Sequence, residues 1–195
     1  MIDVRAVTGD ELAHALPALA ELRIRVFREW PYLYEGSLEY EQSYLRKFSQ
    51  AEDAVIIIAK DNEQIVGAST ASPLLGHADA FAEPFAEKGF APEKVFYFGE
   101  SVLLPEYRGH GIGHAFFEGR EKHAKTLGKY NTASFCAVIR EDDDPRKPAG
   151  YHPLDAFWNK RGFHKEDGLY AEFSWKEPDH QEQVPHRMQF WVKKL

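Results

Sequence analysis

The chain carries three glycines within five residues, at a junction between a strand-like run and a helix-like run. The run before it, residues 95–104, is rich in aromatic and branched residues, and the run after it, residues 111–127, repeats apolar residues at helical spacing. The junction reads Arg108-Gly109-His110-Gly111-Ile112-Gly113-His114. Glycine lets backbone amides approach an anion, and a helix N-terminus adds the positive end of its dipole. The segment predicts either a diphosphate cradle with Arg108 nearby or a tight strand-to-helix turn.

Three better-known motifs fail at the glycines of this chain. The dinucleotide fingerprint G-x-G-x-x-G needs a third glycine where the chain has His114 or Phe116. The Gly-Lys pair at 128–129 lacks both the upstream glycine of a P-loop and the following Ser or Thr. The hydrolase elbow G-x-S-x-G, which starts at position 99, ends in Leu103 instead of glycine. These failures leave an anion-binding turn of another kind.

Hydrophobic periodicity and turn signals divide the chain into alternating helices and strands. Strands are predicted at residues 4–7, 55–59, 65–70, 95–104, 133–139, 169–175 and 187–192, and helices at 11–30, 37–48, 111–127 and 154–161. Residues 73–92 mix Gly, Pro, Ala, Phe and acidic residues, which predicts an irregular or partly helical excursion with a lid as one role. With 195 residues and no repeat or linker, we expect one domain spanning residues 1–195.

Charge and cysteine content narrow the classes of function. The net charge of −7 argues against a nucleic-acid-binding surface. The single cysteine, Cys136, excludes an internal disulfide, and its apolar neighbours predict a core position rather than a nucleophile. His110 and His114 lack a third ligand in the sequence, so no metal is expected. Without a signal peptide or spanning run, we expect a cytoplasmic protein with no membrane or nucleic-acid partner.

Two motifs together resemble the GNAT acetyltransferase superfamily. The family signature is a strand, often a proline, then [QR]-x-x-G-x-[GA] opening a helix, and the chain matches it from Leu103 through Pro105 to Gly113. A second family hallmark, a short helix that ends in Gly-Phe, is similar to residues 157–163, which close with Gly162-Phe163. The resemblance covers almost the whole chain in element order. It implies an α/β fold with a mixed twisted central sheet, splayed into a V and flanked by helices.

The resemblance also implies acetyl-CoA as co-substrate and a set of cofactor-binding residues. Leu103 and Leu104 would offer backbone groups to the pantetheine arm. Asn159 is either a cofactor contact or an exposed helix residue. The pyrophosphate would bind the glycine turn, which comprises Arg108, Gly109, His110, Gly111, Ile112, Gly113 and His114.

Glu100 is the predicted general base. Strand alternation predicts that its side chain shares a face with four apolar side chains, Phe96, Phe98, Val102 and Leu104. A carboxylate on an apolar face is costly to ionise, and a raised pKa suits proton abstraction directly or through water. Many family members carry an acid at the matching strand position. The alternative is a structural carboxylate that pairs with a basic residue.

The group that would protonate the leaving thiolate is less clear from the sequence. The tyrosine that the family usually places in the Gly-Phe helix corresponds here to Trp158, which cannot donate a proton in that role. Tyr151 and His152 lie just upstream, and Tyr151 is the candidate acid. Some relatives dispense with an acid, so the role stays open.

We expect the acceptor pocket to be built from the first two helices and the excursion before the central strand. An aromatic cluster with one carboxylate, which follows the first predicted helix, is the candidate acceptor site. Phe27, Tyr32, Tyr34 and Glu35, with Trp30 among them, suit a cationic or aromatic acceptor, although they would equally pack a helix corner.

The resulting hypothesis is an N-acetyltransferase that moves acetyl from acetyl-CoA to a primary amine by direct attack, without a covalent acyl-enzyme. The amine would belong to a small molecule or a peptide, and a homodimer stays open. A protein N-acetyltransferase would need an open groove and a small-amine enzyme a closed pocket. The alternative from another class is a catalytically silent acetyl-CoA sensor or interaction module, suggested by the missing tyrosine.

Overall fold

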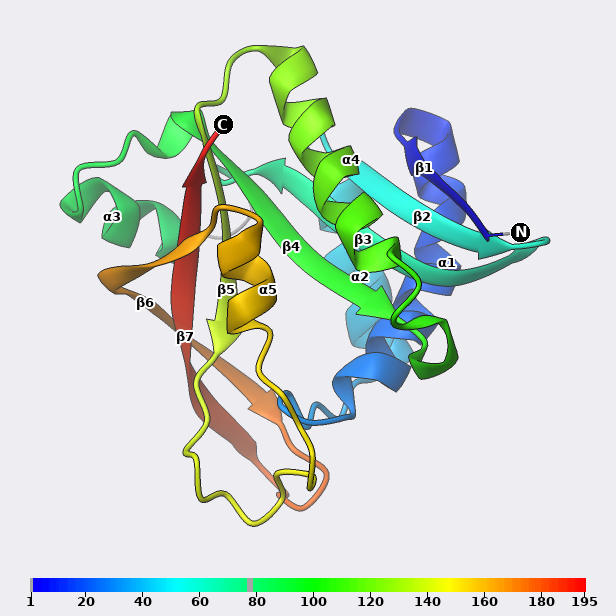
Figure 1. The fold of residues 1–195 in the computed structure, drawn as a ribbon, viewed down its shortest axis with the longest axis vertical. Coiled ribbons are helices and arrows are strands. Elements are labelled where there is room, and N and C mark those ends of the chain that lie inside the picture. The colour runs from blue at the N-terminus through cyan, green and yellow to red at the C-terminus, as the bar shows by residue number, and fades with distance from the viewer. Residues whose placement is uncertain (1, 77–78) are drawn as a thin grey trace.

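The computed structural model describes residues 2–76 and 79–195 (Figure 1). Its strands form one seven-stranded sheet in the order β1-β2-β3-β4-β5-β7-β6. The strands are β1 (Ile2–Val7), β2 (Val55–Asp61), β3 (Gln64–Pro73), β4 (Val95–Leu103), β5 (Thr132–Val138), β6 (His164–Lys176) and β7 (Gln183–Lys194). The helices are α1 (Gly9–Phe27), α2 (Leu38–Ser49), α3 (Asp79–Glu87), α4 (Ile112–Leu127) and α5 (Asp155–Lys160), with short 3-10 turns η1 (Pro92–Lys94) and η2 (Pro105–Tyr107). The predicted α/β class and element order are confirmed.

The predicted excursion between β3 and β4 contains the helix α3. Its Phe81 and Phe85 are buried, and their rings lie 5.3 and 5.0 Å from the ring of Phe190 on β7. α3 is therefore packed onto the sheet rather than free to act as a lid. Residues 77 and 78 of the excursion lie outside the described residues.

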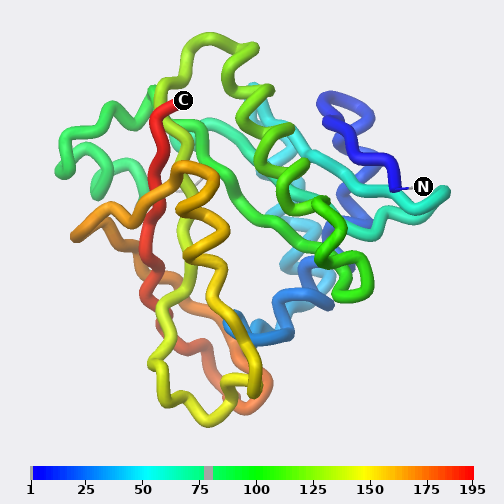
Figure 2. Tube along the Cα trace, viewed as in Figure 1, coloured from blue at the N-terminus to red at the C-terminus, as the bar shows by residue number. Residues whose placement is uncertain are grey.

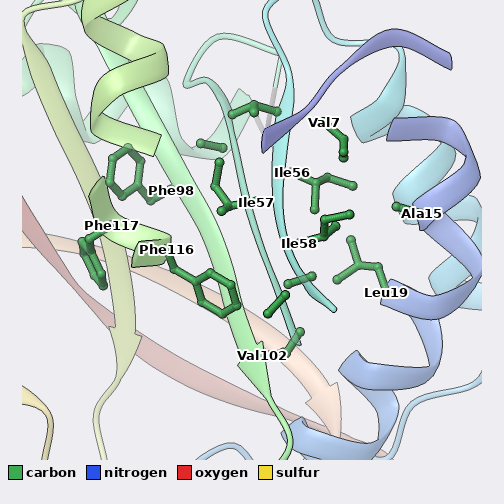
Figure 3. Close-up of a cluster of buried hydrophobic side chains, with 14 of the residues drawn as sticks. Val7, Ala15, Leu19, Ile56, Ile57, Ile58, Phe98, Val102, Phe116 and Phe117 are labelled. Atoms are coloured by element: carbon green, nitrogen blue, oxygen red, sulfur yellow. The ribbon is translucent and has the colours of Figure 1, made fainter. Parts of the chain in front are cut away.

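The core is a sheet sandwiched between α1 and α4. In Figure 3, Ile56 and Ile58 of β2 point towards Leu19 of α1, whereas Ile57 points to the opposite face. A Cβ atom on Gly119 of α4 would lie 2.8 Å from Ile57 Cδ1, so glycine at this position lets α4 approach the sheet closely. Each fully buried isoleucine stabilises the fold by about 1.5–3 kcal/mol relative to an exposed one. This packing fixes α4 against the strands that carry the candidate site.

The sheet opens between β4 and β5. These two strands are parallel and pair over only three residues each, 95–97 with 132–134, and then diverge (Figure 1). The other neighbouring strands of the sheet are antiparallel. The predicted V-shaped splay is thus present, and it leaves one edge of β4 unpaired beyond Tyr97.

The segment between α1 and α2 crosses to the end of β6, as the tube in Figure 2 shows. The backbone amide of Glu35 donates to the carbonyl of Lys176 at 2.8 Å, and Trp175 Nε1 donates to the carbonyl of Tyr32 at 2.9 Å. This segment therefore bridges the two arms of the sheet. Within the described part of the chain, no helix is both long and apolar enough to cross a bilayer.

Candidate active site

The glycine turn has the backbone geometry of an anion-binding site. Gly109 and Gly111 adopt left-handed angles, with φ of +82° and +81°. A Cβ atom at either position would have no other group within 4 Å, so the space outside the turn is open. α4 begins at the next residue and has no acidic residue in its first turn. Because the first amides of a helix lack acceptors within the helix, this end of α4 suits a pyrophosphate.

Four further residues of the predicted pyrophosphate site lie on the turn and the start of α4. His110 and His114 are exposed, whereas Ile112 is buried and Gly113 is half-buried. A Cβ atom on Gly113 would lie 3.7 Å from the ring of Phe157. The two histidine side chains are thus open to a ligand, while Ile112 and Gly113 can offer only backbone amides.

Two arginines lie next to this turn with different partners. Arg108 donates to the carbonyl of Leu103 at 3.2 Å and to Glu29 Oε2 at 3.1 Å, so its guanidinium braces the turn instead of covering it. Arg161, which follows α5, lies with Nη1 3.3 Å from His114 Nδ1. Arg161 is a cation beside the turn that the sequence analysis missed.

The unpaired edge of β4 offers fewer backbone groups than the resemblance implies. The amide of Leu104 donates to the carbonyl of Val66 at 3.1 Å, and the carbonyl of Leu104 accepts from Tyr107 at 3.0 Å. Since backbone groups alternate along a strand, those of Leu103 face the opposite edge, away from β3. Arg108 binds the carbonyl of Leu103. The Leu103 amide is therefore the group that faces the splay, and Leu104 contributes packing.

Two cavities meet at the splay. The α1-side cavity lies between α1, α2, α3 and β6, and its wall includes Tyr44, Tyr97 and Trp175. The α4-side cavity lies between β4, β5, α4 and α5, and its wall includes Phe98, Phe117 and Trp158. Five residues line both cavities: Phe27, Tyr32, Gly99, Glu100 and Cys136. A group in one cavity can therefore reach a group in the other at this shared wall.

A β-bulge aims Glu100 at the shared wall. The register of β3 and β4 shifts so that Thr70 lies opposite both Gly99 and Glu100. The bulge reverses the alternation of side chains, because Phe98 packs against α4 whereas Glu100 pairs with α1 and lines the α1-side cavity together with Tyr97. The prediction that Glu100 shares a face with Phe98 is therefore wrong, since it assumed a regular strand.

The bulge is held from the α4 side by a buried arginine. Arg120 Nη1 donates to the carbonyls of Thr70 at 3.4 Å and Glu100 at 3.3 Å. The amide of Glu100 donates to Thr70 Oγ1 at 3.2 Å. The Arg120 guanidinium lies over the rings of Phe98 and Phe117, and burial lowers its pKa to about 9. Arg120 thus satisfies the carbonyls that the bulge removes from the ladder.

Glu100 belongs to a buried charge network. Its Oε2 lies 2.7 Å from Arg23 Nη1, and Arg23 also binds Glu41, which accepts a 2.8 Å hydrogen bond from Tyr34. Glu100 Oε1 is buried without a hydrogen-bond partner among the described residues. Burial raises the pKa of Glu100 above its ordinary value, and Arg23 opposes that rise without cancelling it. Glu100 is therefore a carboxylate with one oxygen paired to Arg23 and the other buried without a hydrogen-bond partner among the described residues.

Two arginines of this site, Arg23 and Arg120, were not predicted from the sequence. Arg23 follows Leu19 by four residues, and Arg120 follows Phe116 by four residues, so each lies on the apolar stripe of its helix. A charged residue at such a position is the signal that would have identified them.

The segment around α5 contributes to the α4-side cavity. Tyr151 and Trp158 line it, and the Tyr151 ring meets Trp30 edge-on at 6.1 Å. Burial raises the pKa of Tyr151, and Asp155 adds to the rise. Asn159 is exposed on α5. Tyr151 is thus close to the shared wall, while Trp158 occupies the position of the missing tyrosine.

The structure brings three of the four predicted acceptor residues together. Phe27, Tyr32 and Tyr34 line the α1-side cavity. Glu35 does not line it, because its carboxylate pairs with Lys176 at 3.0 Å. Glu35 therefore fastens the segment between α1 and α2 to the end of β6.

Cys136 packs against the hydrophobic core, as the sequence predicted, and it also lines the shared wall. It is half-buried, and its Sγ lies 3.1 Å from the hydroxyl of Tyr97. Burial raises the pKa of its thiol to about 12. The thiol stays protonated at neutral pH, which disfavours a nucleophilic role.

A group of three potential metal ligands lies outside both cavities. Glu177, Asp179 and His180 have ligand atoms within 4.8 Å of one another. The Glu177 carboxylate already pairs with Arg140 and His186, each at 2.7 Å. This carboxylate is engaged in holding the ends of β5, β6 and β7 together.

The residues that form the turn and β4 fall within a match to a known protein family. The model of the Acetyltransferase (GNAT) family matches residues 18–163, which include the turn, Glu100 and the Gly162-Phe163 ending. The chain belongs to the GNAT acetyltransferase family. It is an acetyl-CoA-dependent N-acetyltransferase.

Solved structures of other GNAT proteins share the fold at low sequence identity. The ribosomal-protein-alanine N-acetyltransferase of Brucella melitensis is 16% identical with a TM-score of 0.64, covering 99% of both chains. Arabidopsis thaliana NAA60, in complex with a bisubstrate analogue, is 13% identical with a TM-score of 0.62, covering 100% of this chain and 98% of that one. The aminoglycoside acetyltransferase AAC(6')-Ib, in complex with coenzyme A, is 16% identical with a TM-score of 0.60, covering 100% and 95%. No curated protein matches the chain. The printed names of two of these proteins give different acceptors, a ribosomal protein alanine and an aminoglycoside. The GNAT fold alone therefore does not identify the acceptor of this chain.

Proposed function

We propose that this GNAT enzyme transfers the acetyl group of acetyl-CoA directly to a primary amine, with Glu100 as general base. The observation that carries the proposal is that Glu100 lines both cavities and has a buried carboxylate oxygen, Oε1, without a hydrogen-bond partner among the described residues. A buried carboxylate oxygen without a donor favours a ligand that brings an N–H group. An acceptor amine in the α1-side cavity supplies that group.

The cofactor side of the proposal rests on backbone groups. The pyrophosphate of acetyl-CoA would bind the amides from Gly109 to His114, with His110 and Arg161 nearby as polar partners. The pantetheine arm would lie in the splay, where the Leu103 amide faces the open edge of β4. The thioester would then reach the shared wall beside Glu100.

The proposed reaction proceeds in one displacement. Glu100 accepts a proton from the ammonium of the acceptor, directly or through water. The amine nitrogen attacks the thioester carbonyl, a C–N bond forms, and the C–S bond breaks to release the CoA thiolate. The nitrogen loses its second proton as the neutral amide forms, and this proton replaces, through water, the one that the thiolate receives. Tyr151 is the proposed proton donor to that thiolate, supported by its place in the α4-side cavity and by a raised pKa that keeps its hydroxyl protonated. The products are the acetylated amine and CoA.

Turnover with a panel of amines tests this proposal. Purified protein, acetyl-CoA and each amine are assayed for CoA release with a thiol reagent, and the acetylated product is identified by mass spectrometry. Cys136→Ala should retain kcat within about twofold, because direct attack needs no acyl-enzyme on the thiol of the shared wall. Binding of acetyl-CoA without CoA release for any amine would contradict the proposal, and so would an acetylated Cys136 intermediate.

A further inference from the structure

The residues that line the α1-side cavity indicate the class of acceptor amine, which the fold alone does not. Resting on the proposed function, we infer that the acceptor is a small primary amine with one positive charge on an aromatic or alkyl body, rather than a polyamine or a protein N-terminus. Three features of the cavity support this inference: its charge, its size and its closure.

The cavity wall offers one site for one cation. Glu100 and Arg23 are the charged residues among the described lining residues, and most of the others carry aromatic rings. The guanidinium of Arg23 is already shared between Glu41 and Glu100, and Oε1 of Glu100 remains free. With both carboxylates ionised, Arg23, Glu41 and Glu100 together carry a net charge of about −1 on the α1 side of β4, which suits a single ammonium. Arg120 lines the α4-side cavity instead, where it donates to backbone carbonyls. A ligand with several ammonium groups would leave the remaining charges facing aromatic rings alone.

The cavity is also small and apolar beyond Glu100. Its volume is about 190 Å³, below the roughly 300–1,000 Å³ of pockets that take drug-sized ligands. Phe27, Phe173 and Met188 contribute apolar surface, and Tyr40 of α2 lines the mouth while 57% exposed. Binding of an apolar substrate body against this wall is favourable, because it removes apolar surface from water. A polar body gains little binding free energy there.

The segment above the cavity closes the route that a peptide chain would take. Between α1 and α2, the amide of Glu35 and the carbonyl of Tyr32 are hydrogen-bonded to β6 at Lys176 and Trp175. The Glu35 carboxylate pairs with Lys176 at 3.0 Å, and Arg140 Nη2 donates to the Tyr32 carbonyl at 2.8 Å. An extended peptide between these segments would have to displace these contacts. The closure therefore favours an acceptor that fits below the bridge.

A panel of four amines separates these acceptor classes. Phenylethylamine, ethanolamine, spermidine and a peptide with a free N-terminal alanine are compared by kcat/KM at saturating acetyl-CoA. We expect phenylethylamine to exceed each of the others by at least about 30-fold, the scale on which an apolar pocket discriminates. A higher kcat/KM for spermidine or the peptide, or similar values for all four, would overturn the inference and leave the proposed function standing. Absence of turnover with every amine would instead contradict the proposed function.

A pair of matched variants on α2 tests the cavity itself. Tyr40→Ala removes a ring from the mouth and should raise KM for phenylethylamine about fivefold, the contribution of one aromatic contact. Leu38→Ala removes an equally exposed apolar side chain, 51% exposed, that does not line the cavity, and should leave KM unchanged. Acetyl-CoA affinity should stay constant in both variants. Equal KM values for the two variants would place the acceptor elsewhere.

Discussion

The two sides of the splay differ in the groups that they offer to a ligand: backbone groups on the cofactor side and side chains on the acceptor side. The cofactor side is a run of consecutive residues whose backbone does the binding, with Gly109 and Gly111 in left-handed conformations at the start of α4. The acceptor side is a cavity whose walls come from α1, α2, α3 and strands from both arms of the sheet, and its binding groups are side chains. Substitutions should therefore act on one side through the backbone and on the other through single side-chain groups.

The largest expected effect is at the residue where the two sides meet. Glu100→Gln keeps the size of the side chain but removes the base, so kcat should fall by about 100-fold or more. The acetyl-CoA Kd should change by less than about twofold, because the cofactor turn is untouched. Turnover kinetics and equilibrium binding on the same preparation measure both, with thermal unfolding as the control for folding. Weaker acetyl-CoA binding with unchanged kcat would reverse the assignment of the two sides.

The next effect should be confined to the cofactor side. Gly111→Val forces a branched residue into a left-handed conformation at φ +81°, a strain of about 1–3 kcal/mol, and the acetyl-CoA Kd should rise about 10- to 100-fold. Gly128→Val places the same residue at φ +69° at the other end of α4 and is the matched control. Calorimetry should show weaker binding for Gly111→Val alone. An equal loss of binding in both variants would mean that α4 stability, not the turn, is responsible.

A smaller effect is expected at the proposed acid. Tyr151→Phe keeps the ring in the α4-side cavity and removes the hydroxyl, so kcat should fall about tenfold, less than for a typical acid because a thiolate is a good leaving group. The substitution should leave both substrate affinities unchanged. Steady-state kinetics measure it, and an unchanged kcat would return the acid role to another group or to water.

The smallest effect tests how the bulge positions the base. Thr70→Val removes the acceptor of the Glu100 amide and leaves a buried donor unpaired, so kcat should fall about fivefold and stability by about 1–3 kcal/mol. Ser134→Ala removes another buried hydroxyl, which donates to Trp191 on the far side of the sheet, and serves as control. Denaturant unfolding and kinetics on both variants separate stability from positioning. If kcat falls equally in both, the bulge has no special role.

The same contrast explains what could be predicted from the sequence. The glycine turn is local, so its place between β4 and α4 could be predicted from the sequence, whereas its proposed cofactor role came from the family resemblance. The α/β element order followed from periodicity. Glu100 was identified, but its face was not, because the bulge opposite Thr70 depends on pairing between two strands. Arg23 and Arg120 each lie on the apolar stripe of a helix. They were not predicted because their partners, Glu100 and the backbone of the bulge, belong to other elements of the fold. The contribution of the first two helices and of the excursion before β4 to the α1-side cavity was also predicted, whereas its wall from β6 and β7 was not, because that wall depends on pairing between distant strands.

The most direct test of Glu100 as the base is the pH dependence of kcat/KM for the amine, measured for wild type beside Glu100→Gln. The base must be unprotonated to act, so wild-type kcat/KM should rise with pH as Glu100 loses its proton. Because burial raises the pKa of Glu100, this rise should lie above the ordinary range of a glutamate. In Glu100→Gln, this acidic limb should disappear, with acetyl-CoA affinity preserved. An identical limb in both proteins would contradict the assignment of Glu100 as the base.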